Sequence, residues 1–262
     1  MDVLIVDDAE SVASRGFAFT RRCLDQKSDA VLGLATGGTP LALYALLVAA
    51  YDRGELTFDK VRSFNLDEYL GLSPDHPQSY SAYMQRELFG RIDIQSRNAQ
   101  LPVCEDPEDV DEVCFDYEKQ IIGAGGIDLQ ILGLGENGHI GFNEPASSLA
   151  SRTRLKTLAR GTLEANARFF HAGETQPVTA ITMGIQTILD AREIVLMASG
   201  ANKAAAVAGM IEGPVSAFCP ASALQLHPSV TAIVDQDAAS QLKLKGFYEW
   251  IALQNDRLGR SV

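Results

Sequence analysis

Residues capable of acid–base chemistry gather in one glycine-rich stretch at positions 133–145. The stretch follows an apolar run at 128–132 and carries an imidazole, His139, a carboxylate, Glu144, and two amides. Its four glycines permit positive φ angles and a close approach of the backbone to a ligand. We therefore expect His139 and Glu144 to face one pocket, and the combination predicts an enzyme.

Two plainer interpretations compete with that prediction. A single loop histidine is usually structural, but this chain has only four histidines, and His139 combines glycine neighbours with a nearby carboxylate. A metal site would need a third ligand at a recognisable spacing, and the four cysteines form no Cys-x-x-Cys pair. The pattern favours an acid–base site, and we expect no metal.

Composition narrows the class of protein. With 262 residues and 46% hydrophobic content the chain can bury one large core, and we expect a single domain over residues 1–262. The net charge of −12 argues against binding to nucleic acid or to an anionic membrane surface. No apolar run is long enough to span a membrane, the N-terminus lacks a basic leader and the cysteines are scattered, so we expect a cytoplasmic protein.

Basic residues nevertheless collect between positions 152 and 168. Five arginines and lysines there accompany one acid, Glu164. The segment could hold a small anion, but taken alone the pattern favours a solvated helix face.

Short apolar runs alternate with longer amphipathic segments along the whole chain. Strands are predicted at residues 3–6, 30–35, 61–66, 101–103, 128–132, 193–198 and 230–234. Helices are predicted at residues 8–27, 39–51, 79–89, 107–122, 162–170, 201–211 and 236–255. Strands that are apolar throughout and separated by helices predict an α/β fold, with a mostly parallel sheet covered by helices on both faces.

Ligands of such open sheets bind at the carboxyl ends of the strands, where two further polar motifs fall. The first, Thr-Gly-Gly-Thr-Pro at 36–40, leads into a predicted helix, with Thr39 suited to cap it and Pro40 suited to its first position. Exposed N–H groups at this turn would favour an anion. A plain strand-to-helix turn explains the glycines equally well.

The second motif places two acids, Asp67 and Glu68, after the predicted strand at 61–66. Neighbouring side chains on an extended backbone point to opposite sides, so only one of the two acids should face a ligand. The alternative is that both acids serve only to keep a loop solvated.

Three motifs together resemble one family. Leu-Gly-Leu-Ala-Thr-Gly-Gly-Thr-Pro at 32–40, Phe-Asn-Leu-Asp-Glu-Tyr-Leu-Gly at 64–71 and Gly-Leu-Gly-Glu-Asn-Gly-His-Ile-Gly-Phe-Asn-Glu-Pro at 133–145 are similar to motifs of the glucosamine-6-phosphate deaminases (isomerising). The resemblance continues at 147–156, 167–170 and 224–228, and so covers nearly the whole chain in order. It implies a single-domain, modified doubly wound (Rossmann-like) fold with a mobile lid around residues 154–183.

The resemblance also implies a reaction: glucosamine 6-phosphate and water would give fructose 6-phosphate and ammonia, without a metal or an organic cofactor. Matched residue by residue, Asp67 is the base that carries a proton from C2 to C1, His139 opens the sugar ring, and Glu144 supports that histidine. A short carboxylate can reach both carbons, and an imidazole suits ring opening near neutral pH. The matched phosphate site consists of Thr36, Gly37, Gly38, Thr39, Arg168 and Lys203.

One departure from the family concerns Asn137, which stands where many members have aspartate. Its amide can orient the His139 ring by hydrogen bonding, but it cannot stabilise an imidazolium by charge. The family's hexameric members bind an effector, N-acetylglucosamine 6-phosphate, between subunits, and the matched residues here are Ser147, Ser148, Arg154 and Lys156. The resemblance therefore implies a homo-oligomer, a hexamer, with activation weakened or absent because Glu249 stands at the position of an effector-contacting tyrosine, with Tyr248 beside it.

Two other functions fit a fold of this kind. A 6-phosphogluconolactonase would carry Asp-Glu-Arg at 67–69 and Gly-His-Thr at 138–140, where this chain has Asp-Glu-Tyr and Gly-His-Ile, so the sequence favours the deaminase. A non-catalytic sugar-phosphate sensor would carry an added helix-turn-helix and would often lack the acid–base residues. This chain keeps those residues and shows no N-terminal extension.

Overall fold

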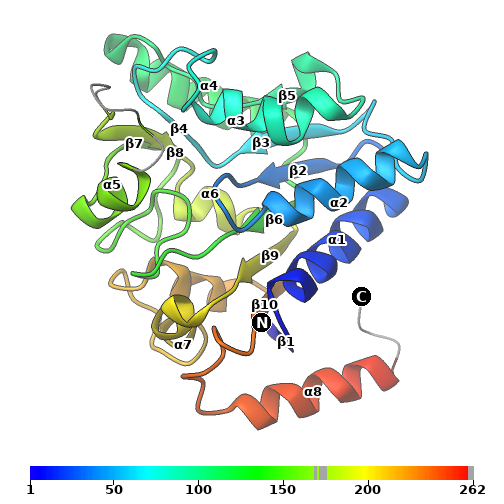
Figure 1. Ribbon diagram of the computed structural model, residues 1–262. Helices are drawn as coiled ribbons and strands as arrows, with labels where there is room; N and C mark the ends of the chain where they lie inside the picture. Colours follow the sequence, from blue (N-terminus) through cyan, green and yellow to red (C-terminus); the bar gives the residue numbers. More distant parts are fainter. Residues whose placement is uncertain (168–169, 171–175, 259–262) are drawn as a thin grey trace.

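A seven-stranded parallel sheet forms the centre of the computed structural model, which describes residues 1–167, 170 and 176–258 (Figure 1). Its strands, in spatial order, are β1 (Asp2–Val6), β10 (Val230–Asp235), β9 (Glu193–Ala198), β6 (Leu129–Leu132), β2 (Val31–Leu34), β3 (Arg62–Asn65) and β5 (Ala99–Gln100). All neighbouring pairs are parallel. Every residue of β2, β6 and β10 is buried, as expected for a sheet covered on both faces.

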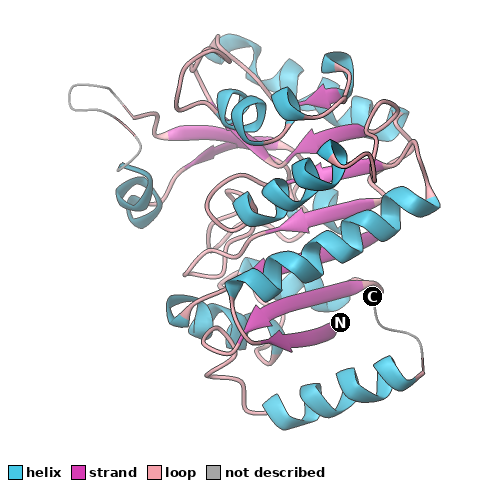
Figure 2. Cartoon of the chain, turned by 45° about the vertical axis from the view of Figure 1, so that its right-hand side comes forward, coloured by secondary structure: helices cyan, strands magenta, loops and turns pink. Residues whose placement is uncertain are grey.

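Helices cover both faces of this sheet, which confirms the predicted α/β fold (Figures 1 and 2). On one face the buried side chains of three helices pack into one apolar cluster: α1 (Ala9–Gln26), α2 (Leu41–Asp52) and α3 (Tyr80–Glu87). Three helices supply the cluster on the other face: α4 (Val110–Gly123), α6 (Ile185–Leu189) and α7 (Ala204–Ile211). The last helix, α8 (Lys245–Arg257), lies along the β1 edge (Figure 1). Within the described residues, no helix has both the length and the apolar character needed to cross a membrane.

A second, antiparallel sheet holds three strands that the sequence patterns did not predict. They lie in the order β4 (Asp67–Tyr69), β8 (Thr179–Thr182) and β7 (Arg154–Thr157). Only Leu66 separates β3 from β4, so the second sheet continues from the carboxyl end of a main-sheet strand. Helix α5 (Arg160–Ala167) follows β7 and stands away from the main sheet (Figure 2).

Two predicted elements need correction. The strand predicted at 101–103 is wrong: β5 ends at Gln100, and Pro102 has no N–H with which to continue the ladder. The helix predicted at 236–255 begins only at Lys245. The carboxylate of Asp235 accepts the N–H of residue 238, and that of Glu212 accepts the N–H groups of residues 243 and 244, so turns replace the first part of that helix.

The start of α2 also differs from the prediction. The helix begins at Leu41 with Pro40 in the capping position, and no side chain caps it, so Thr39 is not the N-cap. A helix that begins in this way leaves its first N–H groups without a side-chain partner. Those groups are available to a ligand.

Candidate active site

A cavity of about 750 Å³ opens at the carboxyl ends of the parallel strands. Its walls come from the segments that follow β2, β3, β6 and β9, together with the start of α5. Four of the predicted site segments line it: residues 36–39, Asp67, the pair Asn137 and His139, and Lys203. The cavity therefore lies where an open α/β sheet is expected to bind its ligand.

Asp67 is the first residue of β4 and lies on the cavity wall with only 6% of its surface exposed. The backbone N–H of Phe142 and the hydroxyl of Thr182 lie near its carboxylate and act to lower its pKa. Burial, followed by the negative charge of Glu68, nevertheless raises the pKa of Asp67 to about 8. A carboxylate with such a pKa is a stronger base than an exposed one, and removal of a proton from carbon requires a strong base.

Glu68 points away from the cavity, which confirms that only one of the two acids faces it. Its Oε1 accepts the N–H groups of Tyr69 and Tyr80, each at 2.9 Å. Its Oε2 accepts the N–H of Ser81 at 2.8 Å and the hydroxyl of the same residue at 2.9 Å. Tyr80 and Ser81 open α3, so Glu68 fixes the start of that helix, where the helix dipole favours an anion.

His139 and Glu144 meet in the loop that follows β6. The Nδ1 atom of His139 lies 3.4 Å from Oε2 of Glu144, and the same oxygen accepts a hydrogen bond of 2.7 Å from Nδ2 of Asn137. The hydroxyl of Thr162 on α5 donates to the other oxygen, Oε1. Burial acts to raise the pKa of Glu144, but the contacts with these three residues lower it to about 2. Glu144 is therefore an anion at neutral pH, set against the histidine that lines the cavity.

Two glycines of this loop leave room for the side chains of His139 and Asp67, which pack directly against the glycine backbone. A Cβ atom on Gly135 would lie 2.3 Å from Cε1 of His139, so the imidazole lies directly against this glycine. Gly141 has a φ of +54°, and a Cβ atom there would lie 3.0 Å from Oγ1 of Thr182 and 3.2 Å from Oδ2 of Asp67. Side chains at these two positions would displace His139 and Asp67.

Asn137 makes no hydrogen bond to the ring of His139, which corrects the expectation that its amide orients the ring directly. Its Oδ1 accepts the backbone N–H of His139 at 3.2 Å, while its Nδ2 is committed to Glu144. Asn137 therefore acts on His139 through the backbone and through the carboxylate. An aspartate here would remove a donor from Glu144 and add a second negative charge beside it.

Asn137→Asp should lower the free energy of unfolding by about 2 kcal/mol near neutral pH, because two carboxylates would meet. The pKa of Glu144 is lowered from 4.5 to about 2 in the fold, so its stabilising contribution is present above pH 4.5 and is lost as the pH falls toward 2. In the variant one carboxyl takes up a proton at mildly acidic pH, so its difference from wild type should shrink there. Urea unfolding at neutral and at acidic pH measures this, and an equal difference at both would contradict it.

Another part of the cavity wall suits an anion. Gly37 has a φ of +93°, and at both Gly37 and Gly38 the space that a side chain would fill is open. Helix α2 begins directly after this turn, and the N–H groups at a helix N-terminus attract anions. Lys203 lines the same cavity, and burial lowers its pKa. The structure thus brings residues 36–39 and Lys203 together as predicted, whereas Arg168 lies outside the described residues.

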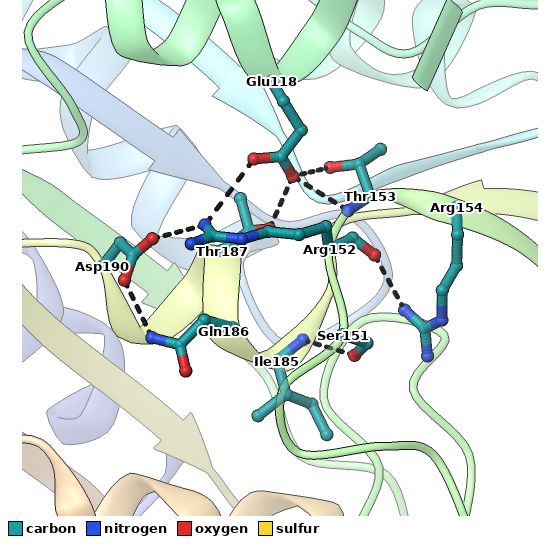
Figure 3. Close-up of polar contacts among 9 residues, drawn as sticks. All are labelled: Glu118, Ser151, Arg152, Thr153, Arg154, Ile185, Gln186, Thr187 and Asp190. Carbon is teal, nitrogen blue, oxygen red and sulfur yellow. Dashed lines mark hydrogen bonds and ion pairs between the residues drawn. The ribbon is translucent and has the colours of Figure 1, made fainter. Parts of the chain in front are cut away.

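The four residues matched to an effector pocket lie outside this cavity. Arg154 and Lys156 share one face of β7, along which burial alternates; Ser147 is buried and Ser148 is exposed. Nη1 of Arg154 donates to the carbonyl of Arg152 at 3.3 Å (Figure 3). Within the described part of the chain, Nη2 of Arg154 and Oγ of Ser147 are buried without a hydrogen-bond partner.

Sequence reasoning missed several residues of the cavity. Tyr80 lines it and stacks on Phe142, with ring centroids 5.9 Å apart and an interplanar angle of 16°. Glu136 accepts a 2.7 Å hydrogen bond from Nδ2 of Asn202, which links the loop after β6 to the loop after β9. Glu136 lies within the glycine-rich motif at 133–145, so it could have been predicted from the sequence. No sequence pattern indicates Tyr80 or Thr162 as residues of the site.

Comparison with known proteins agrees with this geometry. The model of the glucosamine-6-phosphate isomerases/6-phosphogluconolactonase family matches residues 7–233. The chain belongs to this family. Curated relatives named glucosamine-6-phosphate deaminase include a protein of Hahella chejuensis, 56% identical over 98% of both chains. Another, from Colwellia psychrerythraea, is 52% identical over 99% of this chain and 97% of the relative.

Solved structures similar to this chain include a deaminase and 6-phosphogluconolactonases. A structure described as a monomeric glucosamine-6-phosphate deaminase is 43% identical, with a TM-score of 0.88 over 92% of this chain and 100% of that one. A 6-phosphogluconolactonase from Leishmania guyanensis is 21% identical, with a TM-score of 0.70 over 91% of this chain and 97% of that one. The second likeness shows the fold alone. Together they confirm the fold that the resemblance implied.

Proposed function

We propose that this chain is a glucosamine-6-phosphate deaminase, which converts glucosamine 6-phosphate and water to fructose 6-phosphate and ammonia. One observation carries the proposal: the chain is 46–56% identical to curated deaminases over at least 98% of its length. Its identity to solved 6-phosphogluconolactonases is only 18–21%. The chemistry of the cavity supports the same assignment.

The proposed reaction begins with ring opening. His139, supported by Glu144, takes the proton of the C1 hydroxyl and delivers one to the ring oxygen, which gives the open aldehyde. Asp67 then removes the proton from C2, and the aldehyde oxygen takes a proton from the substrate's ammonium group, which gives a neutral enolamine. Asp67 returns a proton to C1, which leaves an imine at C2. Water adds to that imine, and ammonia leaves to give the ketone.

The phosphate is assigned to the turn before α2, with Lys203 and Arg168 as its cationic partners. The proposed ligands from the turn are Thr36, Gly37, Gly38 and Thr39. A phosphate bound at this turn would lie close to its cationic partners, whereas fields from more distant charges are screened beyond about 8 to 10 Å. A chain of net charge −12 can therefore bind an anion at this site. The proposed lid covers residues 154–183: the paired strands β7 and β8 lie within it, and residues 168–169 and 171–175 lie outside the described residues.

A direct assay tests the function. Purified protein should release ammonia from glucosamine 6-phosphate in step with the formation of fructose 6-phosphate. A parallel assay with 6-phosphogluconolactone should show no hydrolysis above the spontaneous rate. No ammonia at both low and high substrate concentration would overturn the proposal, and rapid lactone hydrolysis would transfer the chain to the other branch of the family.

A second proposal concerns assembly and regulation: a homo-oligomer, a hexamer, whose subunits hold N-acetylglucosamine 6-phosphate at Ser147, Ser148, Arg154 and Lys156. Support comes from the two basic side chains on one face of β7 and from the unpartnered polar atoms described above. Against it stands the relative described as monomeric at 43% identity. Light scattering at micromolar concentration decides between the two, because a monomer would have no site between subunits.

A further inference from the structure

We propose that Thr162 is a positioning residue of the active site, because its hydroxyl ties helix α5 to the Glu144 carboxylate and thereby orients the oxygen that faces His139. Thr162 is the third residue of α5 and lines the cavity. We call the hydrogen bond from the Thr162 hydroxyl to Glu144 the tie. Its expected effect on kinetics rests on the proposed function, whereas the hydrogen bond itself does not.

The two oxygens of Glu144 have separate partners. Oε2 accepts the hydrogen bond from Asn137 and faces His139, whereas Oε1 accepts the hydrogen bond from Thr162. In the described part of the chain, no other donor to Oε1 is present. Glu144 is only 6% exposed, and a buried carboxylate oxygen without a donor is costly. Without the Thr162 hydroxyl, the carboxylate would therefore rotate to offer Oε1 another donor, and Oε2 would leave His139.

The strand that leads to α5 is firmly held. Glu118 of α4 accepts hydrogen bonds from the N–H and hydroxyl of Thr153 and from the hydroxyl of Thr187, next to the start of β7 (Figure 3). Arg152 pairs with Asp190 and with Glu118 in the same network. The base of the segment is thus fixed to the main body before α5 begins.

Among the residues of helix α5 whose side chains the structure describes, Leu163 and Thr162 make its contacts with the rest of the protein. Leu163 packs, only partly buried, against the cluster that contains Tyr69 and Phe142, and its carbonyl accepts a 3.1 Å hydrogen bond from Gln176. Among the described residues, the Thr162 hydroxyl makes the side-chain hydrogen bond that joins α5 to the catalytic loop. The seating of α5 over the cavity and the orientation of Glu144 are therefore coupled, so that the catalytic pair is complete only when the helix is in place.

Three variants test the kinetic consequence. Thr162→Val keeps the branched shape but removes the donor, so kcat should fall about tenfold, which corresponds to about 1.4 kcal/mol, while KM stays within about twofold. Thr162→Ser keeps the hydroxyl and should restore kcat to within about twofold of wild type. Glu164→Gln, an exposed change on the same helix, is the control and should leave both constants unchanged. A kcat of Thr162→Val equal to wild type, or Thr162→Ser as impaired as Thr162→Val, would overturn the proposal.

Limited proteolysis tests the tie without reference to activity. Arg160 is exposed at the start of α5, so trypsin can cut after it when the helix leaves its seat. Cleavage there, followed by mass spectrometry, should be about tenfold faster in Thr162→Val than in wild type, because proteolysis follows the population of the open form. Thr162→Ser and Glu164→Gln should match wild type. A wild type that releases no ammonia while Thr162→Val is cut faster would refute the proposed function but not the tie; equal cleavage of all four proteins would refute the tie.

Discussion

Asp67→Asn should lower kcat by about a thousandfold while the KM for glucosamine 6-phosphate stays within about threefold. The physical reason is that, in the proposed mechanism, Asp67 acts only after the sugar phosphate is bound, when it takes a proton from one carbon and returns it to the next. Asparagine keeps the size and the polarity of the side chain but cannot accept that proton. Steady-state kinetics with ammonia detection measures both constants.

The same variant should be more stable than wild type, which separates a catalytic role from a structural one. The pKa of Asp67 is raised from 3.8 to about 8 in the fold, so ionisation of this group opposes folding progressively between those pH values. The neutral asparagine avoids that cost, and the melting temperature at neutral pH should rise by about 3 °C. Asp75→Asn, an exposed change in a loop, should alter neither kinetics nor stability. An unchanged kcat with a raised KM would reassign Asp67 to substrate binding.

Glu68→Gln should lower the free energy of unfolding by about 3 kcal/mol. Both oxygens of Glu68 accept two hydrogen bonds each, from Tyr69 and Tyr80 at Oε1 and from Ser81 at Oε2. Glutamine keeps only one of the two acceptor oxygens. Its NH₂ group takes the place of the other and must then face two hydrogen-bond donors. The start of α3 would lose its anchor, and urea unfolding measures the loss.

Glu68→Gln also bears on catalysis. After burial, the charge of Glu68 is the second cause of the raised pKa of Asp67, so its removal should lower that pKa. The acid limb of the kcat/KM profile, where Asp67 must lose its proton to act as base, should move to lower pH. Glu112→Gln, an exposed change on α4, serves as the matched control. Stability equal to that of the control would show that the four hydrogen bonds do not anchor the helix.

The sequence predicted the parts of the fold that depend on local pattern. Central strands such as β2 and β6 are apolar on both sides, and this property is readable without knowledge of the partner strand. The opposite orientation of Asp67 and Glu68 follows from the period of an extended chain, and it was predicted correctly. The proximity of His139 and Glu144 was predictable because one short loop carries both residues.

The parts that were missed depend on contacts between distant residues. The sequence of strand β7, Arg-Leu-Lys-Thr, taken alone indicates a solvated segment. Its pairing with β8 makes it a strand, and that pairing is not visible in the local sequence. The hydrogen-bond partner predicted for the Asn137 amide was wrong, because the loop places Glu144 beside the amide and not the His139 ring. Thr162 reaches Glu144 across eighteen residues of chain, and a threonine in a helix gives no signal of that kind.

The reaction run in D₂O tests the central claim most directly. One carboxylate, held on one wall of the cavity, should deliver the hydrogen to C1 from one side only. Fructose 6-phosphate should therefore form together with an equal amount of ammonia, and NMR should find all the deuterium that enters by exchange of the Asp67 proton with solvent at a single C1 position, always the same one of the two. Asp67→Asn should form neither product at a comparable rate. Failure of the wild type to form fructose 6-phosphate, or deuterium divided equally between the two C1 positions, would contradict the account.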